Sequence, residues 1–260
     1  MDAQLQSAID ELASRATIVV ATDFDGVLSP LVEDPMAARP LPGTVEALRA
    51  LARMPRTTVA AVSGRDLETL GALTGLVDLP DDERVVLVGS HGAQTSRPEA
   101  GVHALSDAQT MALRALDAAL TAIVEAHPGT RIERKPAAVV LHTRGVEQSV
   151  ADSATADTVA MASQHSKAHV MPGKCVVELS VVDSDKGSAL VDLAAWCGAD
   201  AVYYAGDDVT DERAFARLGD ADLTLKVGEG DTVARHRVAS PQEAAEVLEA
   251  LVEARARHTA

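Results

Sequence analysis

The chain has 260 residues, of which 47% are apolar and only 2% aromatic, so a core of Val, Leu, Ile and Ala is expected, which suits a parallel sheet covered by helices. Its 39 acidic and 23 basic side chains give a formal charge of −16, which argues against nucleic acid and anionic membranes as partners. A small anionic substrate is compatible with this charge only if a metal ion and a few Lys or Arg residues reverse the potential locally.

Strand signals open the chain. Three apolar segments read as strands, and they lie at residues 17–21, 57–62 and 85–88. Each runs into a polar, glycine-containing segment, at residues 23–26, 63–65 and 89–92. A helix is predicted over 44–53, between the first two strands. This alternation of strand, helix and strand is typical of a parallel βαβ sheet.

The character of the sequence changes after residue 96. Four apolar residues fall on one helical face, namely Leu113, Leu116, Leu120 and Ile123. Two extended segments follow this helix, at residues 131–133 and 137–142. A second helix over 148–165 again precedes two extended segments, at residues 168–171 and 175–181. We therefore expect a separate α/β unit here.

The first pattern returns at Lys186, with a helix through Trp196, a strand over 201–205 and an acidic segment after it. A capping box at Ser240 predicts a last helix to about residue 255, followed by a frayed tail. The predicted fold is a doubly wound, Rossmann-like α/β core. Residues 1–96 and 182–260 form this core, and residues 97–181 form an inserted α/β cap. We expect hinges near Ser96 and Val182 and an active site between core and cap.

No other feature marks a targeting signal or a partner. Cys175 and Cys197 are the only cysteines and lack metal-binding spacing, so neither a disulfide framework nor a zinc site is expected. The first residues are acidic rather than basic, and no apolar run reaches membrane-spanning length. These observations favour a cytoplasmic, soluble monomer.

Several polar side chains follow the predicted strands and should meet at one edge of the sheet, because ligands of parallel sheets bind beyond the carboxyl ends of the strands. They are Asp23, Asp25, Ser63, Asp207 and Asp208, with Lys186 nearby. Four carboxylates in one place repel each other unless a cation lies between them. Oxygen ligands without His or Cys select a hard ion and favour Mg²⁺.

This set of groups suits phosphoryl transfer. With Mg²⁺ and Lys186 neutralising the phosphoryl oxygens, Asp23 can attack phosphorus and form an aspartyl-phosphate. Asp25 points to another side of an extended segment and is free to act as general acid and then as general base.

The motifs resemble those of the haloacid dehalogenase-like phosphatases, in the same order. The segment Asp23-Phe24-Asp25-Gly26-Val27 resembles the first motif, which implies Asp23 as nucleophile, Asp25 as acid/base, and the Asp25 carbonyl on the metal. Ser63 matches the second motif and Lys186 the third. The segment 206–211 matches the fourth, which implies Asp207 as a metal ligand with Asp208 and Asp211 supporting it.

Within that superfamily, nearly the whole chain is similar to the trehalose-phosphatase family. The similar segments are residues 23–30, 63–65, 90–93, 133–135, 173–178 and 206–212. The resemblance implies sugar and phosphate contacts from Arg65 in the core and, in the cap, from Glu133, Lys135, Lys174 and Glu178. It differs at Thr143, where the family usually has Tyr, and at Ser180-Val181-Val182, where the family usually has a basic residue and proline.

The function that this resemblance implies is Mg²⁺-dependent hydrolysis of trehalose 6-phosphate to trehalose and phosphate, a step of trehalose biosynthesis. Two alternatives stay open from the sequence. The chain could hydrolyse another sugar phosphate or sugar-acid phosphate, since the departures at Thr143 and Ser180 bear on the substrate. It could also be a non-catalytic sensor of a sugar phosphate, although the intact pair Asp23 and Asp25 argues against this.

Overall fold

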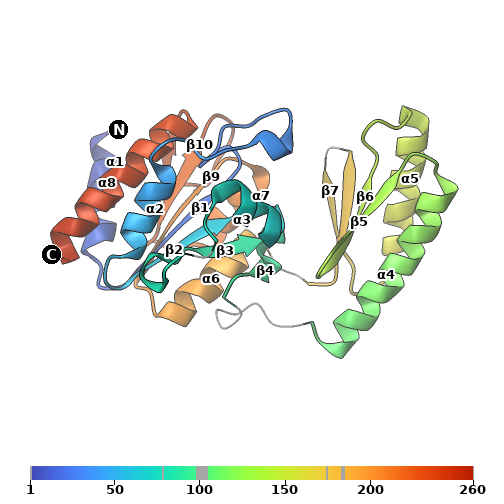
Figure 1. Cartoon of the computed structure of the whole chain (residues 1–260), viewed down its shortest axis with the longest axis horizontal. Coiled ribbons are helices and arrows are strands. Elements are labelled where there is room, and N and C mark those ends of the chain that lie inside the picture. Colours follow the sequence, from blue (N-terminus) through green and yellow to red (C-terminus); the bar gives the residue numbers. More distant parts are fainter. Residues whose placement is uncertain (1, 78, 98–104, 174, 183–184, 260) are drawn as a thin grey trace. The chain divides into compact units, whose positions relative to one another are not determined.

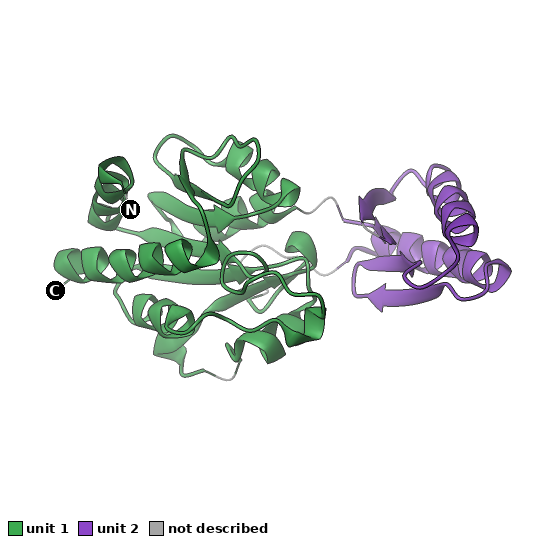
Figure 2. Cartoon of the chain, turned by 90° about the horizontal axis from the view of Figure 1, so that it is seen from above, with its two compact units in different colours: residues 1–102, 184–260 green, residues 103–183 purple. Residues whose placement is uncertain are grey.

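The structure is a computed structural model that describes residues 2–77, 79–97, 105–173, 175–182 and 185–259. The chain divides into two compact units, residues 1–102 with 184–260 and residues 103–183 (Figure 2). The second unit is therefore inserted between the two halves of the first. These divisions lie close to the predicted boundaries, and the hinge positions stay a prediction. None of the described helices is long and apolar enough to cross a membrane.

The first unit contains a seven-stranded sheet in the order β11-β10-β9-β1-β2-β3-β4 (Figure 1). Its strands are β1 (Ile18–Asp23), β2 (Thr57–Val62), β3 (Val86–Gly89), β4 (Gln94–Thr95), β9 (Ala201–Gly206), β10 (Leu223–Val227) and β11 (His236–Val238). Neighbouring strands are parallel except β4, which is antiparallel to β3. The chain winds outward from β1 in both directions, which confirms the predicted doubly wound α/β fold.

Helices cover both faces of this sheet. One face carries α1 (Ala3–Ser14), α2 (Thr44–Ala52), α3 (Leu67–Thr74) and α8 (Pro241–Thr259), and the other carries α6 (Lys186–Cys197) and α7 (Val209–Arg217). The described part of this unit also contains three short 3₁₀ helices, η1 (Pro35–Ala37), η2 (Asp81–Glu83) and η3 (Ser90–Gly92). All six residues of β1 are buried, because a central parallel strand has helices on both sides.

The second unit is a four-stranded antiparallel sheet in the order β5-β6-β8-β7. Its elements are α4 (Asp107–Ala126), β5 (Arg131–Lys135), β6 (Ala138–His142), α5 (Gln148–Ala162), β7 (His169–Gly173) and β8 (Val176–Ser180). Both helices lie on the same face of the sheet (Figure 1). Leu116 and Leu120 of α4 pack there with Val139, Leu141 and Leu179 of the sheet.

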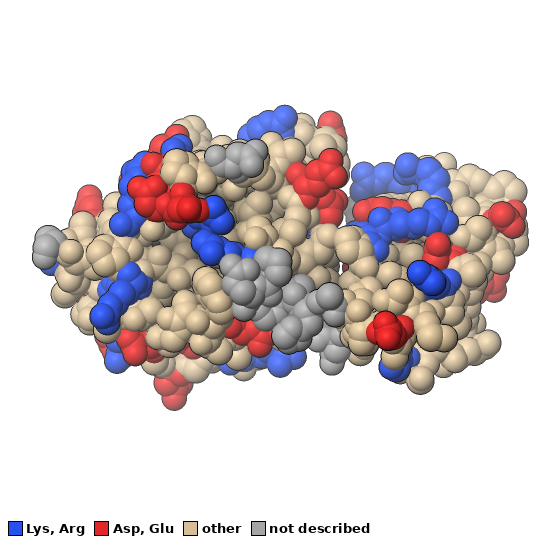
Figure 3. All heavy atoms as spheres, turned by 60° about the horizontal axis from the view of Figure 1, so that its bottom comes forward, with Lys and Arg blue, Asp and Glu red and all other residues tan. Residues whose placement is uncertain are grey.

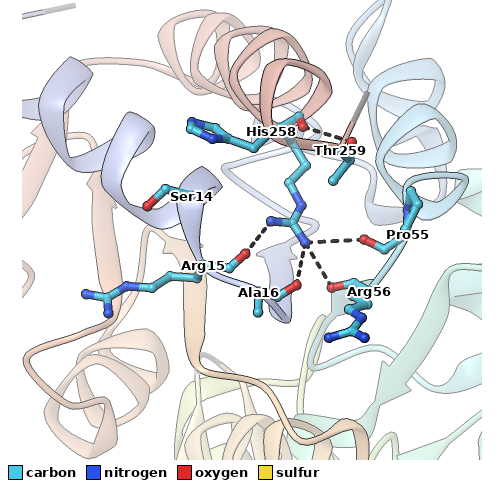
Figure 4. Close-up of a pocket in the computed structure, with 8 residues that line it drawn as sticks. Ser14, Arg15, Ala16, Pro55, Arg56, His258 and Thr259 are labelled. Carbon is cyan, nitrogen blue, oxygen red and sulfur yellow. Dashed lines mark hydrogen bonds between the residues drawn. The ribbon is translucent and has the colours of Figure 1, made fainter.

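The C-terminal helix corrects one expectation. The sequence predicted a frayed tail from residue 255. This prediction is wrong up to residue 259, because α8 runs to Thr259 and Arg255 is only 2% exposed. The Arg255 guanidinium donates hydrogen bonds to the Thr57 hydroxyl and to five backbone carbonyls, those of residues 13, 15, 16, 55 and 56. Figure 4 shows four of these carbonyls, from Arg15, Ala16, Pro55 and Arg56, converging on the guanidinium.

Charges on the surface are mixed. On the face drawn in Figure 3, acidic and basic side chains lie in small groups with uncharged surface between them. Among the ion pairs of the first unit, Arg49 of α2 and Arg53 both contact the carboxylate of Glu83. Pairs of this kind at the surface contribute little to stability.

Candidate active site

The carboxyl edge of the core sheet gathers the residues that the sequence singled out. In the parallel register Asp23 lies beside Val62, so Ser63 follows at the same edge as Asp23. Thr22 lies beside Ala205 on the other side, so Asp207 follows β9 at this edge too. Three segments far apart in the chain therefore end together.

Asp23 is almost completely buried, with 4% of its surface exposed. Its Oδ1 accepts a hydrogen bond from the Phe24 N–H at 2.7 Å, and its Oδ2 accepts one from Lys186 Nζ at 2.8 Å. Burial raises the pKa of Asp23 well above its ordinary value, although the charge of Lys186 opposes this. These hydrogen bonds fix the orientation of the Asp23 carboxylate. Any further positive charge nearby would stabilise its ionised form.

Lys186 is the first residue of α6, where the side chain of Asp185 caps the helix by accepting the Ser188 N–H. Its ammonium also contacts Asp211 Oδ1, at 2.9 Å. Burial acts to lower the pKa of Lys186, but the charges of Asp23 and Asp211 outweigh it and hold that pKa above its ordinary value. Lys186 therefore stays a cation inside the site.

Asp211 is fully buried and both of its oxygens are occupied. Oδ1 accepts from Lys186 and from the Tyr204 hydroxyl at 2.6 Å. Oδ2 accepts the backbone N–H groups of Asp207 and Asp208, at 2.9 and 3.0 Å. A Cβ at Gly206 would lie 2.2 Å from the Asp211 Cγ, so only glycine permits this approach. Asp211 therefore shapes the loop that carries Asp207.

Asp208 is the N-cap of α7, and its carboxylate has a structural role. Its carboxylate accepts the N–H groups of Thr210 and Asp211, at 2.8 and 3.1 Å, and the Thr210 hydroxyl at 2.7 Å. Burial acts to raise the pKa of Asp208, but Lys186 and these hydrogen bonds outweigh it and hold the pKa at about 2.

Asp207 differs from its neighbours, because its carboxylate accepts no hydrogen bond from any residue that the structure describes. Burial, with the charges of Asp211 and Asp208, raises the pKa of Asp207 to about 6. A Cβ at Gly26, whose φ is +77°, would lie 2.0 Å from Asp207 Oδ2. Glycine at position 26 is thus needed both for its backbone conformation and for this close approach.

The donor set fits a hard divalent cation. One carboxylate oxygen from each of Asp23, Asp207 and Asp211 lies within 4.8 Å of the other two. Each Asp211 oxygen already accepts two hydrogen bonds, whereas each Asp23 oxygen accepts one and the Asp207 carboxylate accepts none from the described residues, so Asp23 and Asp207 are the better ligands. The raised pKa values of these two carboxyls reflect repulsion and burial that a cation would relieve. The predicted contact from the Asp25 carbonyl stays a prediction.

Asp25 and Arg65 form a two-pronged ion pair. Arg65 Nε and Nη2 donate to the two oxygens of Asp25, each at 2.7 Å. The guanidinium also lies 5.6 Å from the centre of the Phe24 ring. Asp25 was predicted as the acid/base and Arg65 as a substrate contact, and the structure places each against the other.

Ser63 lies in a tightly folded loop. It is 1% exposed, and its hydroxyl accepts the Arg65 N–H at 3.1 Å. The adjacent segment has two consecutive residues in the left-handed region, Ser90 with φ 50° and His91 with φ 53°. A Cβ at Gly64 would lie 2.5 Å from the His91 ring. The backbone at Gly64 in one loop is thus packed against the His91 ring of the other.

The predicted cap residues lie together within the second unit. Lys135 Nζ contacts Glu178 Oε2 at 2.7 Å, and Glu133 Oε2 contacts His142 Nε2 at 2.7 Å. Lys174 lies outside the described residues, so its predicted sugar contact stays a prediction.

Sequence reasoning missed three polar residues of these sites. Tyr204 lies in an apolar strand, where an aromatic residue indicates a core position, yet its hydroxyl holds Asp211. Lys226 of β10 is 4% exposed and donates to the Asp207 carbonyl at 2.6 Å. A lysine within the apolar run Leu223–Val227 was a usable signal. His142 had no assigned role.

The comparisons with known proteins cover most of this chain. A family model described as trehalose-phosphatase matches residues 21–247. The trehalose-phosphate phosphatase of Mycobacterium tuberculosis is 35% identical over 256 residues, which cover 93% of this chain and 63% of that protein. The chain thus spans less than two thirds of that relative.

Solved structures agree with the fold. A crystal structure of a trehalose-6-phosphate phosphatase related protein matches with a TM-score of 0.69 and 26% identity, covering 92% of this chain and 99% of the other. The C-terminal domain of a C. albicans trehalose-6-phosphate phosphatase matches with a TM-score of 0.69 and 21% identity, covering 96% of each chain. At that identity the second match speaks for the fold alone.

Proposed function

The chain belongs to the trehalose-phosphatase family, and we propose from this membership and from the geometry of its acidic residues that it hydrolyses trehalose 6-phosphate to trehalose and phosphate. The observation that carries the proposal is the clustering at one sheet edge. Asp23 and Asp207 offer oxygens to one point, and Lys186 lies 2.8 Å from Asp23. A buried nucleophile, a second acidic ligand and a fixed cation are what phosphoryl transfer to a carboxylate requires.

In the first chemical step, a carboxylate oxygen of Asp23 attacks phosphorus and the bond from phosphorus to the sugar oxygen breaks. Asp25, which takes up a proton from solvent once Arg65 has moved away, gives that proton to the departing sugar oxygen. In the second step, water attacks the phosphorus of the aspartyl-phosphate while Asp25 takes a proton from that water. Phosphate leaves and Asp23 is regenerated.

Three groups keep the reacting atoms in place. Lys186 offsets negative charge beside Asp23. Asp211 holds both Lys186 and the Asp207 loop, and the Tyr204 hydroxyl holds Asp211. Mg²⁺, held by Asp23, Asp207 and the Asp25 carbonyl, would supply positive charge for the phosphoryl oxygens.

Arg65 links binding to chemistry in this proposal. It holds both Asp25 oxygens in the structure, and an arginine fork fits a phosphoryl group equally well. Arrival of the substrate phosphate would draw Arg65 from Asp25 and leave that carboxyl available for proton transfer. In the second unit, Glu133, Lys135, Lys174 and Glu178 are the proposed contacts to the sugar.

A substrate panel tests the proposal. We expect the protein with Mg²⁺ to release phosphate from trehalose 6-phosphate faster than from glucose 6-phosphate and other phosphorylated mono- and disaccharides, and to lose this activity in EDTA. Equal rates for trehalose 6-phosphate and glucose 6-phosphate would remove the substrate assignment. Activity that survives chelation would show that the reaction does not require the metal. Tight binding without turnover would indicate a sensor.

The nucleophile has its own test. Asp23→Asn keeps the side-chain shape but removes the attacking carboxylate, so turnover should fall by about 10⁴-fold or more. The fold should persist, because Lys186 keeps Asp211 as a partner. Circular dichroism and the thermal midpoint check the fold. A variant with near wild-type turnover would end the mechanism.

A further inference from the structure

The helix-free face of the sheet in the second unit gathers the polar side chains. In the antiparallel register Glu133 lies beside Val140, and Val140 lies beside Glu178, so the two glutamates share one row of the sheet. Residues two positions apart on a strand lie on the same face, which adds Lys135 and His142 to that face. The alternate residues pack against α4 and α5 on the other face.

Each glutamate in this row is held by one cationic or ring nitrogen through a single oxygen. Lys135 holds Oε2 of Glu178, and these two side chains are 11% and 10% exposed. His142 holds Oε2 of Glu133, and these two are 28% and 41% exposed. The Oε1 atoms of both glutamates accept no hydrogen bond within the described parts of the chain. A carboxylate oriented by one oxygen and open at the other can accept a ligand hydroxyl.

Of the four polar residues on this face, His142 has no role in the mechanism described above. Since a carboxylate only accepts hydrogen bonds, Nε2 of His142 is the donor in the 2.7 Å contact. The contact crosses from β6 to β5 diagonally, because His142 lies beside Arg131 and not beside Glu133. The contact therefore restricts the conformations of the Glu133 side chain, which is the more exposed of the two residues.

We propose that His142 is a positioning residue for sugar recognition: it fixes the Glu133 carboxylate so that Oε1 accepts hydrogen bonds from hydroxyl groups of the sugar phosphate. This inference rests on the proposed function. The inference assigns different supports to the two glutamates. Lys135 fixes the mostly buried Glu178, whereas the His142 ring fixes the more exposed Glu133.

The test uses three variants of the full chain. His142→Ala should raise the KM for trehalose 6-phosphate about tenfold, the effect of losing one hydrogen bond to a charged group, and leave kcat unchanged. His142→Gln should restore KM, because a glutamine amide can also donate to the carboxylate. His127→Ala is the matched control. His127 pairs with Asp157 and Ser153 at the helical side of the same unit, so its loss should not change KM.

Binding is measured separately from turnover. In the Asp23→Asn background, calorimetry with trehalose 6-phosphate should show the same loss of affinity for His142→Ala. A double-mutant cycle then decides whether the ring acts through Glu133. Adding His142→Ala to Glu133→Ala should cause no further loss of affinity, because the positioned group is already gone.

The outcomes separate this inference from the proposed function. A wild-type protein that neither binds nor hydrolyses trehalose 6-phosphate would overturn the proposed function. A wild-type protein that does both, with a His142→Ala variant of unchanged KM, would overturn only the role of His142. Effects of His142→Ala and Glu133→Ala that multiply in the double variant would overturn it as well.

Discussion

Two cations of the core unit, Lys186 and Arg255, are each 2% exposed and lie at opposite edges of the same sheet. Lys186 lies at the carboxyl edge, between the carboxylates of Asp23 and Asp211. Arg255 lies at the amino edge, where it donates to Thr57 and to backbone carbonyls that precede β1 and β2. One cation is buried among charges and the other among neutral dipoles.

The difference teaches what each edge can do. The Thr57 hydroxyl and five backbone carbonyls satisfy the N–H groups of Arg255 without adding charge, so Arg255 connects α8 to the loops that precede two strands. At the other edge, Asp23, Asp207, Asp208 and Asp211 outnumber Lys186, and the pKa of Asp207 rises to about 6. Added positive charge would stabilise the ionised carboxylates of that edge, which therefore suits a metal ion.

The largest expected effect is at the charged edge. Lys186→Met removes the cation beside the nucleophile, so kcat should fall by about 10²–10³-fold. The free energy of unfolding should also fall, by about 3–5 kcal/mol, since two buried carboxylates lose their partner. Steady-state kinetics and urea unfolding measure the two losses.

Mg²⁺ sharpens this result. Saturating Mg²⁺ should restore part of the stability of the Lys186→Met variant, because an ion that binds only the folded protein stabilises it. A variant of the amino edge keeps the acidic cluster and should gain as much stability as the wild type, whereas Asp207→Asn, which lacks a proposed ligand, should gain less. An equal gain in Asp207→Asn and the wild type would show that the acidic cluster does not hold the ion.

At the neutral edge the expected loss is one of stability alone. Arg255→Met leaves several buried carbonyls without a donor, so the free energy of unfolding should fall by about 3–5 kcal/mol. The kcat of the folded fraction should not change. Arg257→Ala, which removes an exposed ion pair with Asp10, is the control and should cost less than about 1 kcal/mol. A large loss of kcat in Arg255→Met at full folding would contradict the division between the edges.

The smallest expected effect concerns Tyr204. Burial and the charge of Asp211 raise the pKa of the Tyr204 hydroxyl well above its ordinary value, so this group remains a hydrogen-bond donor. Tyr204→Phe should lower the free energy of unfolding by about 1–2 kcal/mol and kcat about tenfold, with KM unchanged. A change confined to KM would place Tyr204 in substrate binding instead.

The two edges also differ in how far sequence reasoning reaches them. Asp23 ends one buried strand, and Ser63 and Asp207 directly follow two others, so their convergence can be predicted from local pattern and the geometry of parallel sheets. Arg255 cannot be found this way. It lies in an amphipathic helix among other charged residues, and its partner Thr57 is 198 positions away.

Other features depend on register and packing. The contact between Tyr204 and Asp211 requires the turn from β9 into α7, and an aromatic residue in an apolar strand otherwise indicates core. The strands β10 and β11 were not predicted, because they are short and contain Lys226 and Arg237. The pairing of His142 with Glu133 follows only from the alignment of β5 with β6.

The stereochemical course at phosphorus tests the central claim most directly. A phosphorothioate analogue of trehalose 6-phosphate, made chiral with heavy oxygen isotopes, would be hydrolysed in isotopically labelled water and the configuration of the released thiophosphate determined. Transfer to Asp23 and then to water inverts phosphorus twice, so the account predicts net retention. Net inversion would mean that water attacks the substrate directly, and it would contradict the role given to Asp23.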